Sequence, residues 1–198
     1  IIDGKGTERD VISLTANNVR IEGFTIQKGE GFDPTSLFIW RSRGHTISNN
    51  IMRQSKYGIK IRESNSSNIV NNVIVNNTGA GIFLSNSNDN HIIGNLIEKN
   101  AIGASTTFTQ GFITVTPNKF YHNNFINNVN QASMIAPTKW DNGAEGNYWS
   151  DYKGQDINGD GIGDTGTPHL GIDKYPLIER WSETRNFPTL WKGVTYHT

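Results

Sequence analysis

The sequence predicts an all-β fold: a right-handed parallel β-helix, a solenoid of the pectate-lyase type in which short coils stack along one axis. Two observations predict it. A six-residue block, clearest as Ile-Val-Asn-Asn-Val-Ile, recurs with copies that begin at residues 21, 47, 69, 92 and 121. These starts lie roughly 22 to 29 residues apart, a period typical of repeat architectures. Apolar and polar residues alternate around each block with the period of half-buried strands, and no helical period accompanies them.

The elements follow from this repeat in order. Residues 1–30 hold two strand-rich segments that form the first coil. Residues 29–44 lengthen the coil that follows and predict a loop on one face. Residues 45–105 form the regular body, where each block is followed by a second strand that pairs with its equivalent one coil on. Residues 106–117 lengthen the next coil and predict a second loop.

We expect a single domain over residues 1–198, with coils in residues 1–128 and an irregular C-terminal cap in residues 129–198. The repeat stops after Asn128, and four of the five tryptophans follow it. A solenoid needs a cap because its last apolar layer and its strand edges would otherwise stay open to association. The same aromatic residues would also suit a stacking platform for sugar rings, and we favour the cap.

Asparagine fills the blocks for a structural reason. Stacked coils would align Asn50, Asn72, Asn95 and Asn124 in one column. Each side-chain amide in such a column can bond the one above and the one below. Asparagine also tolerates the left-handed backbone conformation that tight corners need. We therefore assign these residues to the scaffold rather than to catalysis.

The composition excludes several classes of function. The formal net charge is zero and no basic run occurs, so the sequence predicts no nucleic-acid partner. There is no cysteine, which excludes disulfides and cysteine-ligated metals. No apolar run reaches the roughly 18 residues of a membrane span. Because the chain opens at Ile1 as if within a strand, we expect a mature or trimmed segment, consistent with part of a larger surface assembly.

The strongest chemical signal is an acidic loop in the C-terminal third. Side-chain oxygens recur there at every second residue and a glycine follows, as in the first half of an EF-hand loop. At the twelfth position Thr167 replaces the bidentate Glu, so an outside carboxylate, such as Asp151 or Asp173, would have to complete the shell. The alternative is a plain turn held by its own Asx hydrogen bonds. We predict a structural Ca²⁺ site with ligands Asp156, Asn158, Asp160, the Ile162 carbonyl and Asp164.

Several stretches resemble a known group of proteins. The asparagine-rich coils resemble the carbohydrate-binding and sugar-hydrolase (CASH) β-helix family, and residues 120–128 are similar to coils of archaeal surface proteins. Residues 146–152, which read Gly-Asn-Tyr-Trp-Ser-Asp-Tyr, resemble with residues 156–164 and 173–177 the ending of NosD-type proteins. The resemblance implies an extracytoplasmic β-helix protein that is periplasmic, secreted or at the cell surface. NosD itself is an accessory factor linked to copper-site assembly, which adds that role to the alternatives.

The repeats hold no evident catalytic constellation. β-Helix lyases need a basic residue beside an acidic groove, and glycoside hydrolases need paired carboxylates. Arg53 and Glu98 share a column, but Val75 separates them, and the columns of Lys56 and Lys60 gather neither acids nor bases. Copper requires several His or Met side chains in reach of one another. The five His and two Met form no such cluster in the sequence.

The sequence therefore favours a non-catalytic, extracytoplasmic β-helix protein that is stabilised by calcium and presents a long face to a glycan or a surface protein. Two alternatives stay open. One is a polysaccharide lyase or hydrolase that works in a groove formed by the loops at residues 29–44 and 106–117. The other is a NosD-like accessory factor for copper-centre assembly. No catalytic residue is assigned.

Overall fold

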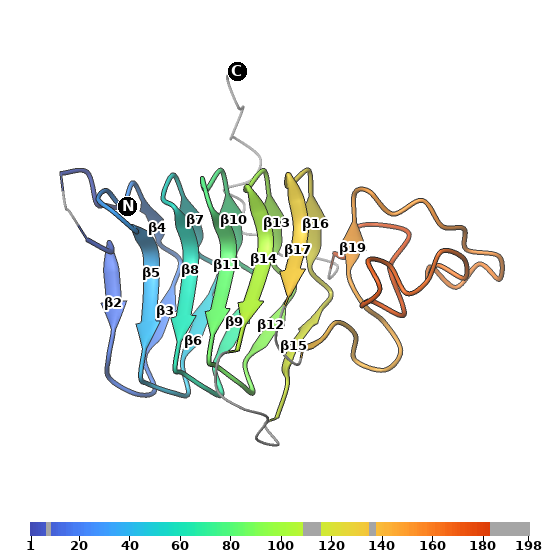
Figure 1. Cartoon of the computed structure of the whole chain (residues 1–198), viewed down its shortest axis with the longest axis horizontal. Coiled ribbons are helices and arrows are strands. Elements are labelled where there is room, and N and C mark those ends of the chain that lie inside the picture. Colours follow the sequence, from blue (N-terminus) through green and yellow to red (C-terminus); the bar gives the residue numbers. More distant parts are fainter. Residues whose placement is uncertain (7–8, 109–115, 135–137, 183–198) are drawn as a thin grey trace.

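The computed structural model describes residues 1–6, 9–108, 116–134 and 138–182. Short strands in this part of the chain wind around one long axis, and the C-terminal residues extend beyond one end of the stack (Figure 1). Three parallel sheets result, so the parallel β-helix predicted from the repeats is confirmed. Among the described residues, no helix has the length and apolarity needed to cross a membrane.

Each sheet takes one strand from every coil. Sheet A runs through β1 (Ile2–Asp3), β4 (Thr25–Gln27), β7 (Ile51–Arg53), β10 (Val73–Val75), β13 (Leu96–Glu98), β16 (Asn124–Ile126) and β19 (Tyr148–Trp149). Sheet B runs through β2 (Ile12–Leu14), β5 (Thr35–Trp40), β8 (Tyr57–Arg62), β11 (Ala80–Ser85), β14 (Ile102–Thr107) and β17 (Asn130–Met134). Sheet C runs through β3 (Arg20–Glu22), β6 (Thr46–Ser48), β9 (Asn68–Val70), β12 (His91–Ile93), β15 (Asn118–Tyr121) and β18 (Thr138–Lys139).

The core consists of apolar side chains stacked in columns, one from each coil. In sheet A the inward column holds Ile26, Met52, Ile74, Ile97, Phe125 and Trp149, all fully buried. The last two are aromatic and stack with ring centroids 4.3 Å apart. In sheet C, Phe120 and Trp140 end the column in the same way, 4.6 Å apart. These two tryptophans therefore fill the end of the core.

At each corner that leads into sheet A, two consecutive residues have different structural roles. The first adopts a left-handed backbone, with φ of 53° at Asn71 and 59° at His122. The second turns its amide inward and bonds the next coil. Asn72 Nδ2 donates to Asn95 Oδ1 at 3.1 Å, and Asn95 Nδ2 donates to Asn123 Oδ1 at 2.9 Å. The asparagine pairs in the repeat thus combine a residue suited to positive φ with one that forms the ladder.

The register of the coil that ends at β16 differs from the prediction. Ile92 pairs with Phe120, one residue earlier than the block alignment places it, and Leu96 pairs with Asn124. The ladder therefore passes through Asn123, and the predicted assignment of Asn124 to the column is wrong. The physical reason is that the fully buried Phe120, rather than Tyr121, fills the inward position of β15. Asn124 instead donates from Nδ2 to the Trp181 carbonyl.

The ladder ends on a buried carboxylate. Asp173 Oδ2 accepts hydrogen bonds from the Asn147 backbone N–H at 2.8 Å and from Trp149 Nε1 at 2.8 Å, while Oδ1 accepts from Tyr175 N–H at 3.0 Å. The Asn147 amide, the last in the ladder, also donates to it. Burial raises the pKa of the Asp173 carboxyl, and these hydrogen bonds oppose that rise. An ionised carboxylate can only accept hydrogen bonds, so it suits a position that is surrounded by N–H donors.

Parallel pairing continues past Asn128, where the recognisable repeat stops. Strands β17, β18 and β19 pair with β14, β15 and β16 and add a further turn that reaches Trp149. The sequence hides this turn because β17 has no Ile, Val, Leu or aromatic residue, only Ala132 and Met134 as apolar residues. The loop expected at residues 106–117 falls largely on residues 109–115, which lie outside the described residues.

Candidate functional site

The outer face of sheet B carries aromatic and basic side chains in register. Because Ile59 and Ile61 point into the core, the residues between and after them in β8 point outward. Lys60 lies between Phe38 of β5 and Phe83 of β11. One position further along, Arg62 pairs with Trp40, whose side chain is exposed. We call this surface the aromatic face, defined by Phe38, Trp40, Lys60, Arg62 and Phe83.

Asp33 belongs to residues 29–34, which form the loop before β5, and two lysines of this surface hold it; the rest of the predicted loop at residues 29–44 is largely β5. The Asp33 carboxylate forms ion pairs with Lys56 Nζ at 2.8 Å and with Lys60 Nζ. Burial by itself would raise the pKa of Asp33, but the hydrogen bonds and positive charges of Lys56 and Lys60 outweigh it and hold the pKa below its ordinary value. The Lys60 ammonium also lies 4.9 Å from the Tyr57 ring centroid and 5.6 Å from that of Phe38. The loop is thereby fixed against β8.

A cavity of about 450 Å³ opens between this loop and the first coil. Phe32, 98% exposed, and Trp40, 39% exposed, stand on its rim. Arg9, Asp10 and Asp33 supply charged groups in the lining. The volume lies in the range of small-ligand clefts, and flat apolar rings beside polar groups suit the two kinds of surface that a sugar presents. The lining of this cavity includes no residue of 106–117, so it differs from the predicted groove between the two loops, most of whose second loop lies outside the described residues.

The acids in this cavity are poorly placed for general acid catalysis. Asp33 is held ionised by its two lysine partners. Asp10 Oδ1 accepts a hydrogen bond from the Thr35 backbone N–H. Retaining and inverting glycosidases need one protonated carboxyl with a raised pKa, and no such shift occurs at Asp33. Asp33 therefore does not supply the protonated carboxyl that such a mechanism needs.

The acidic loop folds as a series of turns closed by its own side chains. Asp156 accepts from the backbone N–H groups of Gly159 and Gly161, at 2.7 and 2.8 Å, and Asp164 Oδ2 accepts from that of Ile157 at 2.7 Å. Within the described residues, no three His, Asp or Glu side chains converge as a metal-binding group. The predicted ligands are thus brought into one loop, where their oxygens bond mainly to backbone amides.

The two outside carboxylates considered for this loop are engaged elsewhere. Asp173 ends the asparagine ladder, as described above. Asp151 Oδ1 accepts a hydrogen bond from Gln131 Nε2 at 3.2 Å and lies 3.3 Å from His169 Nε2. A cation in the loop would therefore take its remaining ligands from the loop backbone and from water.

Residues 5–154 match the family model of NosD, described as a periplasmic copper-binding protein. The chain belongs to the NosD family. A curated relative, the probable ABC transporter binding protein NosD of Stutzerimonas stutzeri, is 37% identical over 68 residues, which make up 31% of this chain and 16% of the relative. Because the NosD family is described as periplasmic, this chain is an extracytoplasmic protein. The chain spans less than a fifth of that relative's length.

Among solved structures, a mutant of the periplasmic alginate epimerase AlgG is similar in fold, with a TM-score of 0.56 and 17% identity. The match covers 66% of this chain and 33% of the epimerase. At that identity it shows the shared β-helix and nothing about activity.

The described residues of this NosD-family chain do not fit a copper site. His45 is fully buried and uses Nδ1 and Nε2 within the coil stack. His122 and His169 each pair with a single carboxylate, and Met52 lies in the core. No three possible ligands converge in the part of the chain that the structure describes. No copper chemistry is therefore derived for this segment, and His197 lies outside the described residues.

The aromatic face was not predicted as a unit. Lys56 and Lys60 were predicted as surface charges, with Phe83 beside Lys60 in the same column, and the register of β8 with β11 confirms that neighbour. The pairing of β5 with β8 adds Phe38 on the other side of Lys60. The alternation of β5, in which Phe38 and Trp40 fall on the outward positions, is the signal that could have found it.

Proposed function

We propose that this chain is a non-catalytic glycan-binding segment of a periplasmic, secreted or cell-surface protein, and that it binds saccharides in the groove beside the aromatic face. The observation that carries the proposal is the cavity of about 450 Å³ with Trp40 and Phe32 exposed on its rim. Exposing large aromatic side chains to water costs free energy, which a stacked sugar ring would recover. A surface protein remains the alternative partner.

We also propose that Ca²⁺ binds the loop of Asp156, Asn158, Asp160, Ile162 and Asp164 and stiffens the C-terminal region. The spacing of oxygen ligands and the glycine at the sixth position support this role. The three carboxylates lie within nine residues of one another, so a divalent cation would relieve their mutual repulsion. The ion would be structural, because the groove lies on the first coils.

The test is a binding screen of neutral and acidic oligosaccharides against the purified chain, followed by calorimetry on each positive. Trp40→Ala is expected to weaken binding about tenfold, the effect of losing one stacked ring. Phe24→Ala, which removes another exposed aromatic outside the groove, is the matched control and should leave affinity unchanged. Equal affinities for Trp40→Ala and the parent chain would refute the groove. Formation of shortened saccharides would instead show that the chain is an enzyme.

A further inference from the structure

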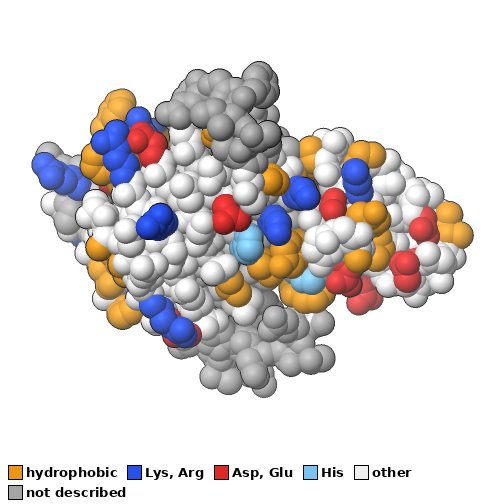
Figure 2. Space-filling model, turned by 90° about the horizontal axis from the view of Figure 1, so that it is seen from below, with side chains coloured by type: hydrophobic (Ala, Val, Ile, Leu, Met, Phe, Trp, Pro, Cys, Tyr) orange, Lys and Arg blue, Asp and Glu red, His pale blue; other side chains and the backbone are white. Residues whose placement is uncertain are grey.

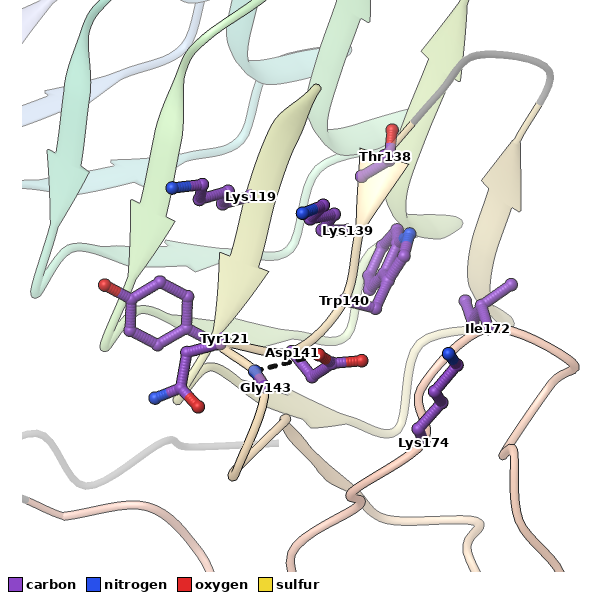
Figure 3. A pocket seen from close by; sticks show the side chains of 10 residues that line it. Lys119, Tyr121, Thr138, Lys139, Trp140, Asp141, Gly143, Ile172 and Lys174 are labelled. Carbon is purple, nitrogen blue, oxygen red and sulfur yellow. Dashed lines mark hydrogen bonds between the residues drawn. The ribbon is translucent and has the colours of Figure 1, made fainter. Parts of the chain in front are cut away.

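A second cleft lies at the opposite end of the coil stack, between sheet C and the C-terminal residues. Its volume is about 460 Å³. Strands β15 and β18 contribute Lys119, Tyr121 and Lys139, and the later chain contributes Ile172 and Lys174 (Figure 3). On the face drawn in Figure 2, basic side chains gather where the coils give way to the narrower C-terminal part, while most of the coil surface is uncharged. We call this site the basic cleft.

The lysines of the basic cleft lie close enough to repel one another. Lys119 and Lys139 pair directly in register, and His91 precedes them in the same column. Like charges opposite one another on neighbouring strands destabilise a sheet. In the described part of the chain, neither these lysines nor Lys174 has a carboxylate within 4.0 Å. Such a set of unpaired charges is what an anionic ligand would stabilise.

The one acid in the lining offsets only part of these charges. Asp141 lines the cleft, but its Oδ1 accepts a hydrogen bond from the Gly143 backbone N–H at 3.0 Å (Figure 3). Three lysines and one aspartate leave the lining with a positive balance. The field of such a lining attracts anions, most strongly at low ionic strength.

Apolar surface accompanies the charges. Tyr121 and Ile172 supply flat or apolar contact area beside the lysines, and the indole ring of Trp140 also lines the cleft. A ligand that fits must therefore carry negative charge and apolar faces together. Acidic sugars have both properties, whereas inorganic anions lack the apolar faces.

We propose that the basic cleft binds an acidic polysaccharide with its carboxylates on Lys119, Lys139 and Lys174. Lys119 and Lys139 lie on adjacent strands about 4.8 Å apart, one sheet spacing, so two neighbouring carboxylates of a polyanion laid along the solenoid axis can each meet an ammonium group. The saccharide nature of the ligand rests on the proposed glycan binding, but the site and its preference for carboxylates do not.

The test uses tetragalacturonate as the probe, and the same tetrasaccharide with its carboxyls reduced to alcohols as the uncharged match. Calorimetry should detect binding of the acidic form only, weakening as salt is raised. Lys119→Ala with Lys139→Ala should lower the affinity about tenfold, as expected for two lost charge contacts. Lys5→Ala with Lys153→Ala removes the same charge elsewhere and should leave the affinity unchanged. Melting curves confirm that both double variants fold.

The outcomes separate this site from the proposed groove. Equal binding of the acidic and reduced tetrasaccharides, or unchanged affinity in the Lys119/Lys139 variant, overturns the basic cleft. If neutral saccharides bind and depend on Trp40 while tetragalacturonate does not bind, the cleft is refuted and the groove stands. A polyglutamate peptide that binds where tetragalacturonate fails would overturn the saccharide assignment.

Discussion

His45 shows how one side chain is adapted to a place in the coil stack. It occupies a corner position whose equivalents in later coils are Ser67, Asn90 and Asn118, each accepting a hydrogen bond from the coil before. His45 Nδ1 accepts from the Val19 backbone N–H at 3.3 Å, and Nε2 lies 2.9 Å from Ser42 Oγ. Nδ1 can accept only in the neutral imidazole, so Nε2 carries the proton. The residue is thus a scaffold member rather than a metal ligand.

The burial of His45 predicts that the folded chain loses stability as the pH falls. Burial lowers the pKa of His45 below its ordinary 6.5. As the pH falls below 6.5, His45 binds a proton in the unfolded chain but stays neutral in the folded chain until the pH reaches its lower folded-state pKa. The stability that is present above pH 6.5 is therefore progressively lost towards the folded-state pKa. His45→Asn keeps an acceptor without a titrating group. We expect the free energy of unfolding to fall less between about pH 7.5 and about pH 5 in this variant than in the parent.

Urea unfolding at the two pH values measures the difference, and His91→Asn is the control. His91 is on the outer face of β12, partly exposed beside Asp89, so its replacement should keep most of the parent's pH dependence. Identical pH dependence in His45→Asn and the parent would show that His45 does not resist protonation in the folded chain.

At the scale of elements, the asparagine ladders join coils whose strands are only three to six residues long in the regular body. Asn95 Nδ2 donates to Asn123 Oδ1 and to the Ile69 carbonyl, and its Oδ1 accepts from Asn72. Each amide therefore ties its own coil to both neighbours. Buried polar groups of this kind stabilise the stack only while every partner is present.

Asn95→Ala should accordingly lower the free energy of unfolding by about 1–3 kcal/mol, because it strands buried partners in two adjacent coils. Asn68→Ala is the matched control, since Asn68 is exposed on the outer face of β9. Its replacement should cost less than about 0.5 kcal/mol. Chemical denaturation of both variants checks the prediction. Equal, small effects would mean that the Asn95 amide contributes little to holding the coils together.

At the scale of the whole molecule, the irregular C-terminal residues are joined to the regular coils through several contacts, which include the pairing of β16 with β19 and the hydrogen bond from Asn124 to the Trp181 carbonyl. The Asp173 carboxylate provides another, and the Trp149 ring stacked on Phe125 provides a further one. The acidic loop at residues 156–164 lies beyond them. A cation that binds only the folded loop would stabilise the whole chain to the extent that cap and coils unfold together.

We therefore expect a higher melting temperature in Ca²⁺ than in EDTA, equivalent to about 2.7 kcal/mol at a hundredfold excess of ion over the dissociation constant. Asp156→Ala with Asp160→Ala should abolish the difference. Glu22→Ala with Glu63→Ala removes two acids from the coils and should preserve it. Calorimetric melting is the measurement. An unchanged melting temperature of the parent chain after chelation would exclude a calcium role in stability.

The coils are legible in the amino-acid sequence alone, because the six-residue block carries both the apolar inward positions and the corner residues of each turn. Local alternation and Asn-Asn pairs such as Asn71-Asn72 act within one coil, so they are readable without the tertiary structure. The extra length at residues 29–44 was also predicted, but the loop on the groove side is limited to residues 29–34, because β5 takes Thr35–Trp40. The acidic loop was equally visible, although its calcium remains a prediction.

The contacts between coils follow only from the folded structure. A shift of one residue moves a side chain to the other face of a strand, so Asn123 and Asn124 exchange roles on a register that irregular coil lengths conceal. The same cause hid the position of Phe38 beside Lys60 and the pairing of Lys119 with Lys139. Coil length sets which residues stack, and packing of the core fixes that length.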